Sequence, residues 1–250
     1  MSNAEYDKNL TGFEPEWSVP DNIHSWVTTR AAGNMATHAG PQQDVEYSRK
    51  RLEDTLPSKP HWLNQIHKDR VIELPTDIHT PAVDGSWTNK RNTVCVVLSA
   101  DCLPVLLCNS SGTAVAALHA GWKGLAAGVL KRGVEVIREE SGSADVIAWL
   151  GPAIEQSAYE VDIKVRDALC RNNVEAEEMF LETTPGHWLC SLEGIARLQL
   201  EQMGVNDICD KGWNRYNGNE NKDSQFFSYR QDLYKQSEER GRFATLVWME

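Results

Sequence analysis

Residues 94–125 read VCVVLSADCLPVLLCNSSGTAVAALHAGWKGL and carry the clearest structural signals in the chain. Apolar runs at residues 93–99 and 104–108 predict short buried strands. The turn residues 109–112, NSSG, separate the second run from a further strand predicted at 113–118. We therefore expect these segments to form a hairpin or meander.

A helix is predicted directly after this region. Between residues 123 and 140, Leu125, Val129, Leu130 and Ile137 recur on one face at helical spacing. Predicted helices and strands are mixed irregularly along the chain, which predicts an α+β fold in a single domain. The expected division is a lead-in at 1–20 and one domain at 21–250. The other predicted elements are strands at 23–29, 146–150, 205–208, 226–229 and 245–248, helices at 46–56, 164–171 and 192–203, and a polar loop at 212–224.

Composition and charge narrow the function classes. The 250 residues carry a formal net charge of −11, which argues against a general nucleic-acid binder. The polar N-terminus has no signal core, and no apolar run is long enough to span a membrane. Six cysteines without a Cys-x-x-Cys motif are typical of reduced thiols, so we expect a cytoplasmic protein. We expect no nucleic-acid or membrane partner, and both a monomer and a homodimer stay open.

Three reactive side chains stand at the ends of apolar segments. His67 follows WLNQI, Cys102 follows the strand predicted at 93–99, and His119 follows VAAL. Side chains at the ends of elements can converge on one cavity. Two imidazoles and one thiolate suit zinc, and three protein ligands leave the fourth tetrahedral position open, as in catalytic sites.

The same residues allow other interpretations. Cys102 can be a small buried side chain beside two satisfied histidines. It can also be a nucleophile with His119 or His67 as its base, which would suit a metal-free hydrolase or amidase. The wide spacing of the three residues matches no compact zinc motif, so the pattern alone does not decide between a metal site, buried side chains and a cysteine nucleophile.

Several segments resemble one known family. Their order and content are similar to the YfiH-like family, whose members are described as laccase-domain or polyphenol oxidase proteins and as purine nucleoside phosphorylases. The match covers most of the chain, and the ADC and HAGW segments are its most specific part. The segments are 62–71 WLNQIHKDRV, 99–109 SADCLPVLLCN, 117–125 ALHAGWKGL, 149–161 WLGPAIEQSAYEV, 226–230 FFSYR and 241–248 GRFATLVW.

The resemblance implies a four-layer α/β/β/α sandwich with mixed sheets. It also implies a metal, usually zinc and sometimes copper, held by His67, Cys102 and His119. The implied small-molecule substrates are phosphate and the purine nucleosides adenosine, inosine, guanosine and methylthioadenosine, with deamination of adenosine as a further reaction. Bacterial relatives are also linked to the editing of peptidoglycan precursors. The laccase label implies oxidation of phenols by copper, but the seven histidines include no His-x-His pair, so we expect one mononuclear site.

Substrate-binding residues also follow from the resemblance. Arg30 matches a family arginine that could hold phosphate, and Arg230 and Arg242 are weaker candidates. Gln65 and Asp101 are assigned to the edge of the same substrate site, where they would orient the metal ligands. The loop after Arg30, AAGNMATHAGPQQD, and the C-terminal segment depart from the family pattern. A binding protein with reduced turnover is therefore a further hypothesis.

Overall fold

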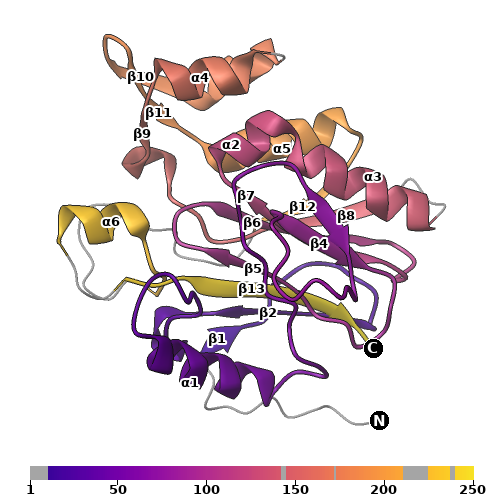
Figure 1. The fold of residues 1–250 in the computed structure, drawn as a ribbon. Coiled ribbons are helices and arrows are strands. Elements are labelled where there is room, and N and C mark those ends of the chain that lie inside the picture. Colours follow the sequence, from indigo (N-terminus) through magenta and orange to yellow (C-terminus); the bar gives the residue numbers. More distant parts are fainter. Residues whose placement is uncertain (1–10, 142–144, 172, 211–224, 237–239) are drawn as a thin grey trace.

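The protein stacks four layers in the order helix, sheet, sheet, helix (Figure 1). This arrangement confirms the expected α+β fold, a four-layer α/β/β/α sandwich in a single domain. The polar loop predicted at 212–224 lies outside the residues that can be described. The computed structural model describes residues 11–141, 145–171, 173–210, 225–236 and 240–250.

The first sheet contains four antiparallel strands. In spatial order they are β1 (Gly12–Phe13), β2 (Ile23–Thr28), β13 (Phe243–Met249) and β5 (Cys95–Ser99). β13 is an interior strand, because it pairs with β2 on one side and with β5 on the other. β1 falls within the segment expected as a lead-in and pairs with β2.

The second sheet is mixed and contains six strands. In spatial order they are β12 (Asp207–Cys209), β8 (Val146–Leu150), β6 (Leu103–Asn109), β7 (Val115–Ala120), β4 (Gly85–Thr88) and β3 (Val71–Glu73). The pairs at the two ends of the sheet are parallel, and the others are antiparallel. β6 and β7 form the hairpin predicted across the NSSG turn. The preceding strand does not join them, since β5 belongs to the first sheet, so the chain crosses between sheets at Asp101 and Cys102.

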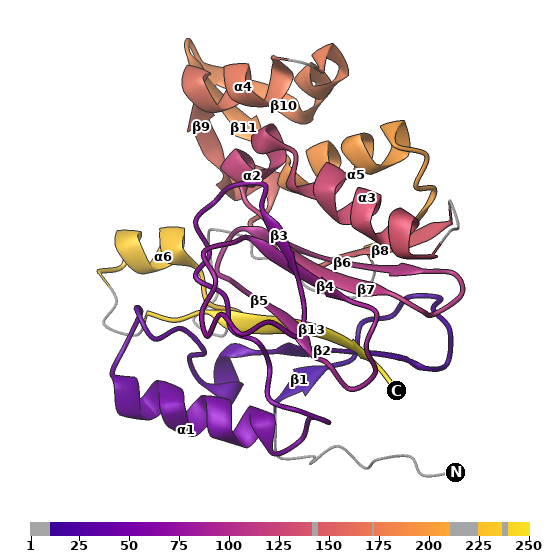
Figure 2. The ribbon, with the colours of Figure 1, turned by 45° about the vertical axis from the view of Figure 1, so that its right-hand side comes forward.

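Helices cover the outer faces of both sheets (Figure 2). α1 lies against the first sheet, and α2, α3 and α5 lie against the second. A small antiparallel sheet, β10-β11-β9, stands beside α4 at the far end of the molecule. α6 lies at the edge of the sandwich. The bounds are α1 Gln42–Glu53, α2 Trp122–Ala127, α3 Val129–Ser141, α4 Ile163–Cys170, α5 Leu192–Gln202, α6 Tyr229–Tyr234, β9 Glu160–Asp162, β10 Phe180–Thr184 and β11 His187–Cys190.

Side-chain alternation along the strands fills three separate cores between the four layers. In β6, Leu103, Val105 and Leu107 pack toward α3 and α5, whereas Leu106 and Cys108 pack between the two sheets. β5 and β13 divide in the same way between the intersheet core and the core under α1. β5, β6 and β13 therefore read as nearly continuous apolar runs, because both of their faces are buried.

The helix predicted at 123–140 is in fact two helices. Gly128 has a φ of +96° in the left-handed region and ends α2, where its N–H donates to the carbonyls of Gly124 (2.9 Å) and Leu125 (3.2 Å). α3 begins at the next residue. The apolar spacing continues across the break, which explains why the pattern indicated a single helix.

Two other predicted elements also differ from the structure. The strand predicted at 226–229 is absent; Phe226 and Phe227 are buried, and Ser228 caps α6 by accepting a hydrogen bond from the N–H of Gln231 (3.1 Å). The helix predicted at 46–56 begins four residues earlier, at Gln42, directly after Pro41. Pro is well suited to precede a helix because its missing N–H would have no partner there. None of the helices in the described parts of the chain has the length and apolar content needed to cross a bilayer.

We expect Leu106→Ala to lower the free energy of unfolding by about 3 kcal/mol, because it opens a cavity between the two sheets. Leu106 is fully buried, whereas Leu181 in β10 is 55% exposed and offers a matched control. Leu181→Ala should change stability by less than about 0.5 kcal/mol. Urea unfolding followed by tryptophan fluorescence measures both, and equal effects would contradict the assignment of the intersheet core.

Candidate active site

The structure brings together the three side chains singled out in the sequence. The ligand atoms of His67, Cys102 and His119 all lie within 4.8 Å of one another. His67 comes from the loop before β3, Cys102 from the crossing between the two sheets, and His119 from β7. The two imidazole rings meet edge to face with their centroids 4.8 Å apart. Residues from three parts of the chain thus form a candidate metal site.

Gly121 makes the close approach to Cys102 possible. A Cβ on this residue would lie 2.7 Å from the Cys102 sulfur, nearer than such atoms approach in proteins. Gly121 is also the residue before α2, so the helix begins directly beside the sulfur. The neighbouring Trp122 is half-buried and packs against the core, although it also lines the pocket.

A buried carboxylate that sequence reasoning missed holds this cluster together. Asp84 is fully buried, lies directly before β4 and accepts a hydrogen bond from the His119 Nδ1 (3.0 Å). It also accepts the backbone N–H groups of Ile66 (3.2 Å), His67 (2.7 Å) and Lys68 (2.7 Å). A bond to Nδ1 leaves Nε2 of His119 for a ligand, which is how carboxylates orient metal-binding histidines. The sequence gives no local signal for this role.

Charges in the cluster favour a thiolate beside an imidazolium in the metal-free protein. Burial alone would raise the pKa of Cys102, but the charge and hydrogen bond of His119, together with His67, outweigh it and lower this pKa to about 6. Burial opposes the charged form of His119 as well, yet Cys102 and Asp84 raise the pKa of His119 to about 9. The thiolate is the form of cysteine that binds a metal or attacks a substrate.

Two non-glycine residues of the site have left-handed backbone conformations. His67 has a φ of 58° and Asp101 a φ of 93°. The N–H of His67 is fixed by Asp84, as described above. The carboxylate of Asp101 accepts hydrogen bonds from the Ser228 hydroxyl (2.6 Å) and the Arg230 N–H (2.8 Å). Such conformations cost about 1–3 kcal/mol each and persist only where neighbouring contacts impose them.

The side chain of Gln65 is occupied by the protein itself. Its Nε2 donates to the carbonyl of Leu98 (2.8 Å), and its Oε1 accepts the N–H of the same residue (2.8 Å). This pair of bonds clamps the His67 loop to β5. The expected roles of Gln65, in orienting the metal ligands and in contacting substrate, both stay predictions.

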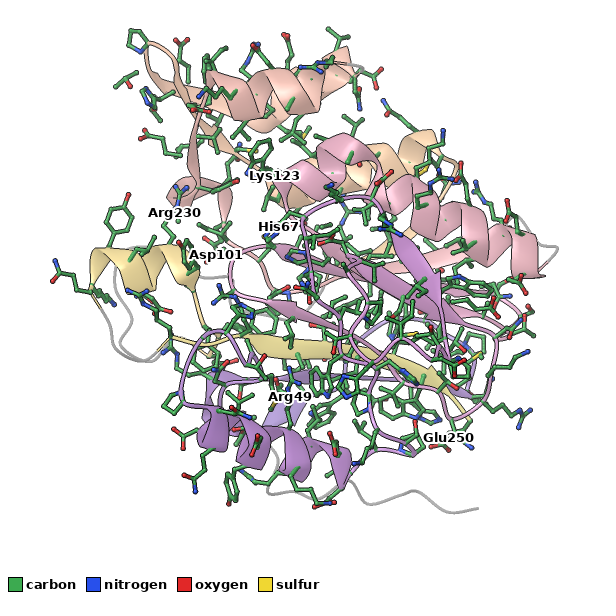
Figure 3. The ribbon with its side chains drawn as sticks, in the orientation of Figure 1. Arg49, His67, Asp101, Lys123, Arg230 and Glu250 are labelled. Carbon is green, nitrogen blue, oxygen red and sulfur yellow. The ribbon has the colours of Figure 1, made fainter. Side chains whose placement is uncertain are left out.

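The cluster opens into a pocket of about 1130 Å³. Figure 3 shows His67, Asp101, Lys123 and Arg230 gathered around one region between α2 and α6. Arg230 is anchored there, because its Nη1 donates to the carbonyl of Glu160 (2.9 Å) and its guanidinium lies 4.9 Å from the ring centre of Tyr159. The residues that line the pocket in its polar part include Arg49, Gln65, His67, Asp101, Cys102, His119, Lys123, Tyr159, Arg230 and Arg242.

Arg30 is not among the residues that line this pocket. Its guanidinium packs 4.6 Å from the ring centre of Phe227, donates to the carbonyl of Phe226 (3.4 Å) and lies 3.8 Å from Asp232. The side chain thus braces the segment that leads into α6. Its expected contact with phosphate stays a prediction.

Comparison with known proteins places this arrangement in a family. Residues 27–250 match the family model described as multi-copper polyphenol oxidoreductase laccase. A protein of Escherichia coli named purine nucleoside phosphorylase YfiH is 38% identical, over 94% of this chain and 97% of its own. A purine nucleoside phosphorylase of Pseudomonas aeruginosa is 36% identical, with the same coverage. The chain belongs to the YfiH-like, laccase-domain family.

Solved structures agree with this membership. A Neisseria meningitidis protein superposes with a TM-score of 0.84 at 36% identity, covering 97% of this chain and all of the other. A YfiH protein of Bacillus licheniformis superposes with a TM-score of 0.81 at 26% identity, covering 91% and 93%. Within the described residues of this YfiH-like protein, the His67–Cys102–His119 cluster is the one group of three or more such side chains close enough to hold a metal.

We expect Asp84→Asn to lower the free energy of unfolding by about 2 kcal/mol, since an amide has one acceptor oxygen for the donors that the carboxylate now serves. Asp77→Asn makes the same change of charge at an exposed position and should leave stability within about 0.5 kcal/mol of the wild type. Denaturant unfolding of both variants in chelator, without metal, provides the measurement. If Asp84→Asn unfolds at the same denaturant concentration as the wild type, Asp84 does not anchor the site.

Proposed function

We propose that this YfiH-like protein is a zinc-dependent purine nucleoside phosphorylase acting on adenosine, inosine, guanosine and methylthioadenosine. The observation that carries the proposal is the set of two imidazoles and one thiol within 4.8 Å at a pocket also lined by Lys123, Arg230 and Arg242. The names of the relatives support the reaction class. The single three-residue cluster in the described part of the chain does not suit a multi-copper oxidase.

The donor set fits zinc. Two imidazole nitrogens and one thiolate are ligands that zinc prefers, and three of them leave one tetrahedral position for water or substrate. Asp84 fixes the ring of His119, and the depressed pKa of Cys102 supplies the thiolate. When bound, zinc would act as a Lewis acid on the group in the open position. Copper also accepts imidazole and thiolate, so the metal is a matter for experiment.

The pocket residues suit phosphorolysis. In this reaction a phosphate oxygen forms a bond to the anomeric carbon while the bond from that carbon to the purine nitrogen breaks. The purine leaves with the electron pair and takes up a proton, giving free base and ribose 1-phosphate. The cationic side chains that line the pocket, among them Lys123, Arg230 and Arg242, would attract the anionic nucleophile and stabilise the charge that develops during the reaction. Deamination of adenosine to inosine, in which water adds to the purine carbon that carries the amino group and ammonia leaves, would use the same pocket.

Incubation of the purified full chain with adenosine should release adenine only when phosphate is present. Ribose 1-phosphate should form in equal amount, because the two products come from one bond cleavage. Chromatography identifies adenine, inosine and ribose 1-phosphate, and chelator followed by zinc tests the metal. Release of adenine at the same rate without phosphate, or no turnover of any of the four nucleosides, would contradict the proposal.

Cys102→Ser should remove most of the bound zinc and lower phosphorolysis at least about 100-fold, since a hydroxyl is a poor zinc ligand. Cys170→Ser changes a free, half-buried thiol in α4 and should retain both metal and activity. Elemental analysis and initial rates on the two variants provide the comparison. Full metal content and full activity in Cys102→Ser would refute the assigned site.

A metal-free cysteine hydrolase or amidase is the second candidate. Cys102, His119 and Asp84 form a chain in which a carboxylate orients an imidazole beside a thiolate. This is the order of groups in a nucleophilic triad. It predicts hydrolysis that survives chelator and is lost on alkylation of Cys102, whereas zinc should protect Cys102 from alkylation under the first proposal.

A further inference from the structure

A second group of basic side chains lines the pocket on the side of α1. His38, Arg49 and Arg242 all belong to the pocket wall, and His38 lies at its exposed rim. Figure 3 shows Arg49 near α1, away from Lys123 and Arg230, which lie toward α2 and α6. In a chain with a net charge of −11, a local concentration of cations is a specific feature.

The segment 34–39 ties these residues together. The Arg49 Nε donates to the carbonyl of Met35 (2.9 Å), and the N–H of Met35 donates to the carbonyl of Arg242 (3.0 Å). The N–H of Arg242 in turn donates to the Oδ1 of Asn34 (2.9 Å). The Arg49 guanidinium stacks on Trp62 at 3.8 Å from the ring centre. The backbone at both arginines and at the segment that carries His38 is therefore fixed.

Arg242 connects this wall to the metal cluster. It follows Gly241, where a Cβ would lie 2.5 Å from the ring of Phe227, so the chain can run closely past this ring only with glycine. Its Nη1 donates to the carbonyl of Gly241 (2.7 Å), and its guanidinium lies 5.5 Å from the ring centre of Tyr229. Burial lowers the pKa of Arg242, while the charges of Asp101, Cys102 and Asp232 raise it. Burial and the charges of Arg242 and then Arg49 lower the pKa of His38. All three side chains line the same pocket.

Neither arginine of this wall forms an ion pair within 4.0 Å among the residues that the structure describes. The charges of Asp101 and Asp232 act on Arg242 without an ion pair, and both oxygens of Asp101 already accept hydrogen bonds from Ser228 and Arg230. Burial lowers the pKa of Arg49 to about 10, although Glu53 opposes this change. A half-buried guanidinium without an ion-pair partner gains from a bound anion.

We propose that His38, Arg49 and Arg242 form a binding subsite for a phosphate group. The planar forks of the two arginines can each offer two N–H groups to phosphate oxygens, and His38 can add a donor from the rim. The inference deepens the proposed function, on which its relevance to phosphorolysis rests. It moves the phosphate from Arg30, which braces α6, to the wall opposite Lys123. The phosphate group can be inorganic phosphate or a phosphate ester on a nucleoside.

Direct titration of inorganic phosphate into the full-length protein tests the subsite without reference to catalysis. Calorimetry should show that Arg242→Gln weakens phosphate binding at least about tenfold and His38→Asn about threefold. Arg91→Gln is the control, because it makes the same change of charge at an exposed turn far from Arg242. The neighbouring Asn92 N–H donates to the carbonyl of Met249, at the opposite end of β13 from Arg242. Arg91→Gln should bind phosphate as the wild type does. Because His38 lies at the rim, its variant also remains informative if Arg242→Gln folds poorly.

Three results would overturn the subsite. They are the absence of phosphate binding by the wild type at millimolar concentration, unchanged binding in both Arg242→Gln and His38→Asn, and an equal loss in Arg91→Gln. Adenosine and adenosine 5′-monophosphate distinguish the two sources of phosphate. If the monophosphate binds more tightly than adenosine, and this difference depends on Arg242, the natural ligand is a phosphate ester. If adenosine and its monophosphate bind equally, and inorganic phosphate binds in an Arg242-dependent way, the ligand is the free ion.

Kinetics separate this inference from the proposed function. If the wild type catalyses phosphorolysis, His38→Asn should raise KM for phosphate about threefold and leave KM for adenosine unchanged. Phosphorolysis with a wild-type KM for phosphate in both variants would reject the subsite and keep the proposed function. Arg242-dependent phosphate binding without any turnover of nucleosides would keep the subsite and reject the proposed function.

Discussion

The hydrogen bonds of Asp84 are the constraint on which the site depends. This carboxylate is fully buried, and a buried charge is costly unless every oxygen has a partner. Asp84 meets that condition with three backbone N–H groups of the His67 loop and with the ring of His119. These partners lie in separate segments of the chain. One side chain thus sets the distance between two of the three candidate ligands, before any metal or substrate contributes.

The third ligand takes its place from the layering of the sheets. Cys102 lies where the chain leaves β5 in one sheet and enters β6 in the other. The crossing requires an unusual backbone at Asp101, and Ser228 and Arg230 at the start of α6 stabilise it through the carboxylate. The start of α6 is therefore hydrogen-bonded to the residue before Cys102, although α6 supplies none of the three candidate ligands.

The sequence predicts features whose signal is local. The strands at 93–99 and 113–118 follow from apolar runs that end at turn residues, and they correspond to β5 and β7. His67, Cys102 and His119 are apparent because reactive side chains at the ends of such runs are uncommon. The break at Gly128 was missed, because apolar spacing continues through it.

Contacts between distant segments were beyond this kind of reasoning. Asp84 acts on residues of another loop and another strand, and nothing near it in the chain signals this role. The same holds for Arg49, whose place in the pocket wall depends on a bond to Met35. The packing of Arg30 on Phe227 was equally hidden in the sequence, and its contact with phosphate stays a prediction. The direction of a side chain is decided by tertiary packing.

The interior position of β13 bears on how the protein is made. This strand is the last in the chain, yet it separates β2 from β5, and Arg242 immediately precedes it. During translation, β2 and β5 cannot pair with β13 until residues 243–249 have left the ribosome. A nascent chain can form most of the second sheet earlier, but its pocket lacks Arg242 until then. A chain that stops before residue 243 would therefore leave the edges of β2 and β5 exposed and prone to aggregation.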